Sequence, residues 1–207
     1  MIRKIVFKYL TWPILKGLLG MQIHYPKSIL KQGQAVFIAN HNSHLDTAGL
    51  LSGLPFHIAR KIRPVIGRDY FDRVPWQEKW SRWLLKAINI PRKKTDRKTG
   101  ENPITMMTDA LDQGDSLLLF PEGTHGKPEK MEPFKPGIGR LLTLRPDIPF
   151  IPIFIENASM VLPDGSKLPV PHQFSIRLGE AQLVQSTEVP EVVEEVQNAV
   201  MALKKAS

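Results

Sequence analysis

Short apolar runs alternate with segments of helical periodicity along most of this chain. Six of these runs are short and continuous enough to form strands buried on both faces of a sheet. The predicted strands are residues 35–40, 64–67, 88–91, 116–120, 150–155 and 174–178. Strands of this kind with helices between them are typical of α/β proteins. We therefore expect a single α/β domain with a central, mostly parallel sheet flanked by helices.

Four helices are predicted between and after these strands, over residues 47–54, 102–113, 138–144 and from Pro190 onward. The second has the clearest boundaries, because Asn102 can cap it, Pro103 suits its first turn and Gly114 can end it. Its buried stripe is expected to be Ile104, Met107 and Leu111. The C-terminal helix is expected to turn four apolar side chains inward: Val193, Val196, Val200 and Leu203.

The N-terminal residues 1–21 are rich in apolar side chains but also carry Arg3, Lys4, Lys8 and Lys16. These charges argue against a membrane-spanning helix and against a cleaved signal peptide. As a helix kinked at Pro13, the segment would place one apolar stripe in line: Phe7, Leu10, Ile14 and Leu18. Two interpretations are open. The helix lies in a membrane interface, with Lys4 and Lys8 at lipid phosphates, or it packs on the protein core.

The composition narrows the possible functions. The chain has 207 residues, of which 42% are apolar, which fits one folded domain. It has no cysteine, which excludes disulfides, thiolate metal sites and a cysteine nucleophile, and fits a reducing compartment. The net charge of +8 suits nucleic acid, anionic lipid or an acidic carrier protein. No nucleic-acid-binding motif accompanies the cations, so no nucleic-acid partner is expected.

The first candidate for chemistry follows the strand predicted at 35–40. His41 and Asp46 are five positions apart, a spacing that suits a turn from a strand into a helix better than one helix face. A carboxylate at one imidazole nitrogen would make the other a general base. Asp46 is also an ordinary residue for a helix start. A metal site with His44 is the alternative. The usual binuclear hydrolase pattern has histidines two apart, and here they are three apart, so no metal is expected.

The second candidate, Glu122-Gly123-Thr124, follows the strand predicted at 116–120. Glycine allows a tight turn whose amides can face an oxyanion, and Glu122 can bind a substrate hydroxyl. The alternative is an ordinary turn with an exposed glutamate. Arg92 follows another predicted strand and Lys135 precedes a predicted helix, so both cations can join these amides in an anion site. Each of these cations alone is more often a surface charge.

In order along the chain, four segments resemble the conserved blocks of the glycerolipid acyltransferase family, which includes the 1-acylglycerol-3-phosphate acyltransferases. They are Asn40-His41-x-Ser43-x-x-Asp46, Ile90-Pro91-Arg92, Phe120-Pro121-Glu122-Gly123-Thr124 and Ile151-Pro152-Ile153. Phe134-Lys135-Pro136-Gly137 is similar to a segment that follows the third block. The resemblance runs from about residue 36 to residue 155, and no serine-nucleophile or dinucleotide motif competes with it.

The resemblance implies direct acyl transfer from acyl-CoA or acyl carrier protein to a lysolipid hydroxyl, with no cofactor and no covalent acyl-enzyme. His41 is then the general base, Asp46 orients it, and amides near Gly123 stabilise the oxyanion. Arg92, Glu122, Gly123, Thr124 and Lys135 are expected to hold the substrate. The leading acceptor is 1-acyl-glycerol-3-phosphate, which would give phosphatidic acid.

In this context residues 1–30 are expected to be a membrane-associating segment and residues 31–207 the catalytic domain. The protein is then expected on the cytoplasmic face of the cell's inner membrane, held without a spanning helix. Its partners would be an anionic bilayer that contains the lysolipid and an acyl carrier protein or coenzyme A thioester.

The chain departs from the family pattern after Thr124. The family often has arginine and serine at positions that hold His125 and Gly126 here. A titratable side chain therefore replaces a permanently charged phosphate ligand. Another lysophospholipid or a lyso-aminolipid is accordingly an alternative acceptor. A thioesterase and a non-catalytic lipid-binding protein are the alternatives in other functional classes.

Overall fold

The sheet has seven strands in the order β1-β7-β6-β2-β5-β3-β4 in this computed structural model, which describes residues 2–41, 43, 45–68, 81–91, 101–123, 131–161 and 170–204. The strands are β1 (Gln22–His24), β2 (Val36–Ala39), β3 (Ile62–Gly67), β4 (Ile88–Ile90), β5 (Ser116–Leu119), β6 (Phe150–Glu156) and β7 (Ser175–Leu178). Every neighbouring pair is parallel except β6 and β7. The α/β prediction is confirmed, and a strand lies at each of the six predicted places.

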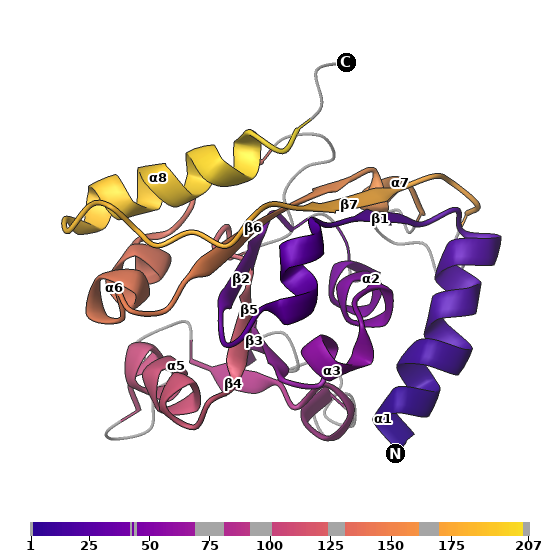
Figure 1. Cartoon of the computed structure of the whole chain (residues 1–207), viewed down its shortest axis with the longest axis horizontal. Coiled ribbons are helices and arrows are strands. Elements are labelled where there is room, and N and C mark those ends of the chain that lie inside the picture. The colour runs from indigo at the N-terminus through magenta and orange to yellow at the C-terminus, as the bar shows by residue number, and fades with distance from the viewer. Residues whose placement is uncertain are drawn as a thin grey trace.

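Helices cover both faces of the sheet (Figure 1). One face carries α2 (Leu45–Gly53), α3 (Phe56–Ala59) and the N-terminal helical segment, which comprises α1 (Ile2–Lys4), η1 (Ile5–Thr11) and η2 (Ile14–Leu18). The other face carries α5 (Pro103–Asp112), α6 (Pro136–Leu144) and α8 (Val189–Met201). Three short helical turns complete the described elements: η3 (Lys27–Lys31), η5 (Ser81–Leu85) and α7 (Ala158–Val161).

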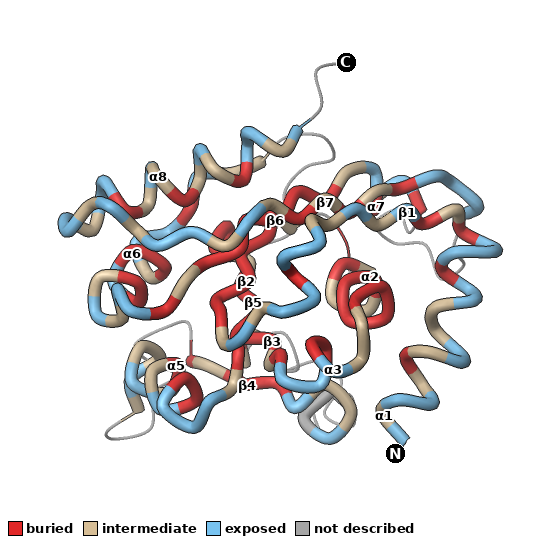
Figure 2. The backbone as a smooth tube through the Cα atoms, viewed as in Figure 1, coloured by how far each residue is buried: buried red, intermediate tan, exposed pale blue. Residues whose placement is uncertain are grey.

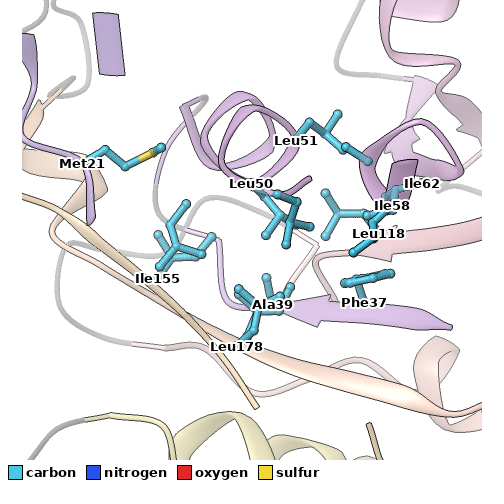
Figure 3. Packing of buried hydrophobic residues seen from close by; sticks show 14 of the residues in the cluster. Met21, Phe37, Ala39, Leu50, Leu51, Ile58, Ile62, Leu118, Ile155 and Leu178 are labelled. Carbon is cyan, nitrogen blue, oxygen red and sulfur yellow. The ribbon is translucent and has the colours of Figure 1, made fainter. Parts of the chain in front are cut away.

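Alternation along the central strands divides the core in two. Phe37 and Leu118 belong to the apolar cluster on the α2 face, which Figure 3 shows at close range. Their neighbours Ile38 and Leu119 belong to the cluster beneath α5, α6 and α8. Both faces of these strands are therefore buried, as Figure 2 shows for the centre of the molecule. This burial explains why the strands read as continuous apolar runs.

Local signals set the helix boundaries. Asn102 Oδ1 accepts a hydrogen bond from the Ile104 amide at 3.0 Å, and Gly114 follows the helix with a φ of 82°. The prediction for this helix is confirmed to within a residue. α2 and α6 each begin two residues earlier than predicted. In α6 the reason is Pro136, whose fixed φ suits the first turn.

The N-terminal helical segment has two different faces. Phe7, Leu15 and Leu19 are buried in the cluster on the α2 face. The predicted stripe is divided, because Phe7 is buried whereas Leu10 is 57% and Leu18 is 62% exposed. No helix in the described part of the chain is both long and apolar enough to cross a membrane.

Two cations of this segment point into the protein. The Lys8 ammonium donates to the carbonyls of Ser52 and Leu54, both at 2.5 Å, at the C-terminal end of α2. The Arg3 guanidinium donates to the carbonyls of Arg60 and Ile62. The prediction that Lys8 contacts lipid phosphates is therefore wrong. Carbonyls at a helix end lack partners within the helix, and a cation satisfies them.

Candidate active site

The predicted site residues lie at the carboxyl edge of the parallel strands. His41 lies two residues beyond β2 and Glu122 three residues beyond β5, and these strands are paired with Ile38 opposite Leu119. Parallel strands bring their carboxyl ends to the same edge, where side chains can meet over a cleft. Groups about 80 positions apart in sequence are therefore neighbours.

His41 and Asp46 form a hydrogen-bonded pair. His41 Nδ1 lies 2.9 Å from Asp46 Oδ2, and the same oxygen accepts the Ser43 amide at 2.9 Å. Asp46 is in the first turn of α2 and fully buried, whereas the His41 side chain is 17% exposed. With Nδ1 donating to the carboxylate, Nε2 is the nitrogen left to accept a proton. The five-residue spacing thus forms the strand-to-helix turn that the sequence predicts.

Phe120 adds an aromatic contact that sequence reasoning missed. Its ring stacks on the His41 imidazole with centroids 4.2 Å apart and an angle of 27° between the planes. Leu118, Ala39 and Phe120 belong to the apolar cluster on the α2 face. Because strand side chains alternate with a period of two, Phe120 and His41 continue the faces of β5 and β2 that hold Leu118 and Ala39, and this period was the available signal. The ring limits the orientations that the imidazole can adopt.

Glu122 is buried, not exposed at the surface of a turn. Its side chain accepts two backbone amides, His41 N–H at Oε1 (2.7 Å) and Glu132 N–H at Oε2 (2.9 Å). The residue is 2% exposed. Burial raises the pKa of the Glu122 carboxyl above its ordinary value, and the two amides oppose that rise. Its predicted contact with a substrate hydroxyl stays a prediction.

Gly123 and Lys135 lie together, as the sequence predicts. Gly123 has a φ of 73°, and a Cβ added to it would lie 2.3 Å from Lys135 Nζ. The Lys135 amide donates to the Pro121 carbonyl at 2.9 Å, which holds the start of α6 against the turn after β5. The positive φ therefore favours glycine here, and a Cβ would also displace the Lys135 side chain from its place against the turn.

A groove extends from this turn along the other face of the sheet. Its volume is about 730 Å³, and its ends and walls include Gly123, Lys135 and Arg140. Most of the lining is apolar and comes from α5, α6 and the ends of β3 to β5, including Ile104, Met107, Leu119, Ile138 and Leu144. The sequence did not predict the groove, because it depends on how two helices distant in sequence pack side by side.

Two predicted site residues, Arg92 and Thr124, lie outside the described residues, and so do His44 and His125. Within the part of the chain that is described, no three His, Asp or Glu side chains gather as a metal site would require. The described groups are those of an acid–base site: an imidazole paired with a carboxylate, a glycine turn and a lysine.

Comparisons with known proteins agree with this chemistry. A protein-family model described as Acyltransferase matches residues 20–156. A chloroplastic 1-acyl-sn-glycerol-3-phosphate acyltransferase of Brassica napus is 27% identical over 138 residues, which are 64% of this chain and 36% of that protein. The alpha form of 1-acyl-sn-glycerol-3-phosphate acyltransferase of Ovis aries is 28% identical over 155 residues, covering 69% of this chain and 48% of that one. The matched region thus spans less than half the length of these relatives.

A solved structure shares the fold. The crystal structure of the 1-acyl-sn-glycerophosphate acyltransferase PlsC of Thermotoga maritima superposes with a TM-score of 0.70. The alignment covers 99% of this chain and 82% of that one at 20% sequence identity. The N-terminal helical segment therefore belongs to the part that has a structural counterpart, although the family model begins only at residue 20.

Proposed function

This chain belongs to the acyltransferase family, and on that basis we propose that it moves a fatty acyl group from acyl-CoA or acyl carrier protein to the free hydroxyl of a lysophospholipid. The proposed acceptor is 1-acyl-sn-glycerol-3-phosphate, and the product is phosphatidic acid. The observation that carries the proposal is the 2.9 Å contact between His41 Nδ1 and a buried Asp46 at the edge of the sheet. Binding a lipid requires no such base.

The reaction is one displacement at the thioester carbonyl. His41 Nε2 takes the proton of the acceptor hydroxyl while the hydroxyl oxygen forms the new C–O bond to the thioester carbonyl carbon. The C–S bond then breaks, and the thiolate that leaves takes the proton back from the imidazolium. Asp46 stabilises the imidazolium between these steps. Backbone amides near Gly123 and the Lys135 ammonium stabilise the negative charge on the carbonyl oxygen, and Arg92 and Thr124 remain proposed acceptor ligands.

The groove is the proposed site of the acyl chain. An apolar channel of this volume falls in the range of small-molecule sites, and it reaches the turn that would hold the thioester carbonyl. Lys135 lines the groove and lies against Gly123, which supports its proposed role beside the carbonyl oxygen. In this placement the acyl chain lies in an apolar groove, while the thioester carbonyl lies among polar groups at the turn.

The N-terminal helical segment is the proposed contact with the membrane surface on the cytoplasmic side. Its exposed large apolar side chains are Ile2, Ile5, Tyr9, Leu10, Ile14 and Leu18, and Lys4 and Lys16 are exposed beside them. An amphipathic helix that buries such a face in the lipid headgroup region holds an enzyme at the surface without spanning the bilayer. Lys8 takes no part in this contact, because it caps α2.

The first test measures products directly. The full chain is incubated with acyl-CoA or acyl carrier protein and a panel of lysolipids, and the lipids are identified by mass spectrometry. His41→Ala is expected to lower transfer by about 10²–10⁴-fold with the fold intact. His172→Ala, at an exposed histidine, is the matched control and should leave transfer unchanged.

The outcomes separate the alternatives. His41-dependent acylation of a different lysolipid would keep the mechanism and change the acceptor, with His125 as the first residue to examine. Release of free fatty acid without acylated lipid would indicate a thioesterase. No reaction with any acceptor, from folded protein and both donors, would favour a lipid-binding protein.

A further inference from the structure

We propose that Glu122 is a positioning residue of this site: it fixes the backbone of the His41 turn and supplies negative charge beside the imidazole, and it does not bind the acceptor hydroxyl. The inference rests on the proposed acyl transfer. It differs from the role that the sequence suggests for this glutamate, and three features of the structure support it.

The first feature is that the carboxylate already has partners. Each oxygen accepts one backbone amide, at 2.7 Å from His41 and 2.9 Å from Glu132. Glu122 is 2% exposed. Each oxygen could accept a second hydrogen bond, but so buried a carboxylate offers almost no surface to a substrate hydroxyl, and moving it out would leave two buried amides without an acceptor, which is costly. The side chain is therefore engaged before any substrate arrives.

The second feature is what the two amides connect. One belongs to the base itself. The other belongs to a segment that continues to Lys135, whose own amide donates to Pro121 at 2.9 Å and whose side chain lies against Gly123. A single carboxylate thus ties the proton-accepting side of the site to its cationic side. Losing the tie would let the two sides shift against each other.

The third feature is charge. In the described part of the chain, two carboxylates contact His41, that of Asp46 on α2 and that of Glu122 after β5, and the Lys135 ammonium lies against Gly123. Two anions of low exposure against one exposed cation favour the protonated imidazole that forms when His41 takes the acceptor's proton. The Phe120 ring stacks on the imidazole and shields that face of the ring from water.

Two substitutions separate the effect of the two amide hydrogen bonds from the effect of the negative charge. Glu122→Gln keeps the length but loses the charge and one acceptor. Glu122→Asp keeps the charge but is too short to reach both amides. Both should lower kcat by roughly 10- to 100-fold while leaving the acceptor KM unchanged, since misplacement of a catalytic group by about 1 Å has effects of this size. Only Glu122→Gln should shift the acidic limb of kcat/KM to lower pH, because an imidazole with fewer anions nearby is harder to protonate.

Glu194→Gln, the same change on the exposed side of α8, is the matched control and should alter none of these values. A raised acceptor KM with normal kcat in Glu122→Gln or Glu122→Asp would overturn the positioning role and restore that of a substrate ligand. An acidic limb that stays in place in Glu122→Gln would overturn the charge effect. Absence of transfer by the unmodified chain would instead overturn the proposed function, so the two failures are distinguishable.

Discussion

The two faces of the sheet carry different parts of the proposed reaction. On the α2 face, polar groups are fixed by short hydrogen bonds: His41 to Asp46, and the His41 amide to Glu122. On the α5–α6 face, the groove is mostly apolar, and its two cations, Lys135 and Arg140, form no ion pair within the described residues. Proton transfer and chain binding are thus assigned to opposite sides of one strand edge.

Strand alternation is the physical basis of this division. Leu119 and Phe120 are consecutive and both contribute to the lining of the groove, but only the Phe120 ring also stacks on His41. Because successive side chains of a strand point to opposite faces, one strand end can serve two environments. Buried polar groups must be paired and are therefore fixed in place, whereas an apolar groove selects its ligand by shape.

After the loss of His41 itself, the largest effect is expected where the two faces meet, at Gly123. Gly123→Ala adds a methyl group to a residue with a φ of 73° and into the space of Lys135 Nζ. Displacing both the lysine and the amides of the turn should lower kcat by about 10²–10³-fold, as loss of an oxyanion donor does. Steady-state rates with one saturating acceptor measure it.

Gly114→Ala is the matched control for that substitution. Gly114 also has a positive φ, 82°, but nothing lies within 4 Å of an added Cβ. It should cost stability through backbone strain and leave kcat unchanged. Equal losses of activity in both variants would mean that strain, and not the contact with Lys135, explains the effect.

A smaller, selective effect is expected on the groove side. Met107→Phe places a larger ring in the lining of the groove and should reduce kcat/KM for a long-chain donor by about 10-fold relative to a short-chain donor. Changes at His41 should instead lower the rate for all chain lengths together. Met160→Phe, at a partly exposed position on α7, is the control. Equal losses for long and short donors would remove the groove from chain binding.

The sequence allowed the strands and the pair of His41 and Asp46 to be predicted, because each is a local pattern. β1 was missed because its three residues, with polar Gln22 and His24, form no apolar run. The contacts of Glu122 with His41 and of Arg3 with Ile62 join residues 81 and 59 positions apart. No periodicity encodes such contacts. The groove depends in the same way on the packing of α5 against α6.

The effect on chemistry should be smallest at the N-terminal helical segment, which packs one apolar side on the α2 face and leaves other apolar side chains exposed. Leu10→Ser combined with Leu18→Ser should weaken liposome binding by at least ~10-fold, since a fully buried leucine contributes about 1.5–3 kcal/mol. Turnover of a short-chain, water-soluble acceptor should not change, because neither leucine is part of the core.

Leu183→Ser, at another exposed leucine, serves as the control for this pair. Flotation with anionic vesicles measures binding, and parallel assays with soluble and vesicle-bound acceptor measure its consequence. A loss restricted to the vesicle-bound acceptor would place membrane contact on the same side of the sheet as His41. The acceptor would then enter over α2, while the acyl chain occupies the groove on the other side of the sheet. Unchanged vesicle binding would leave the segment as a helix that only packs on α2, and the acceptor's route would then have to be sought on another surface.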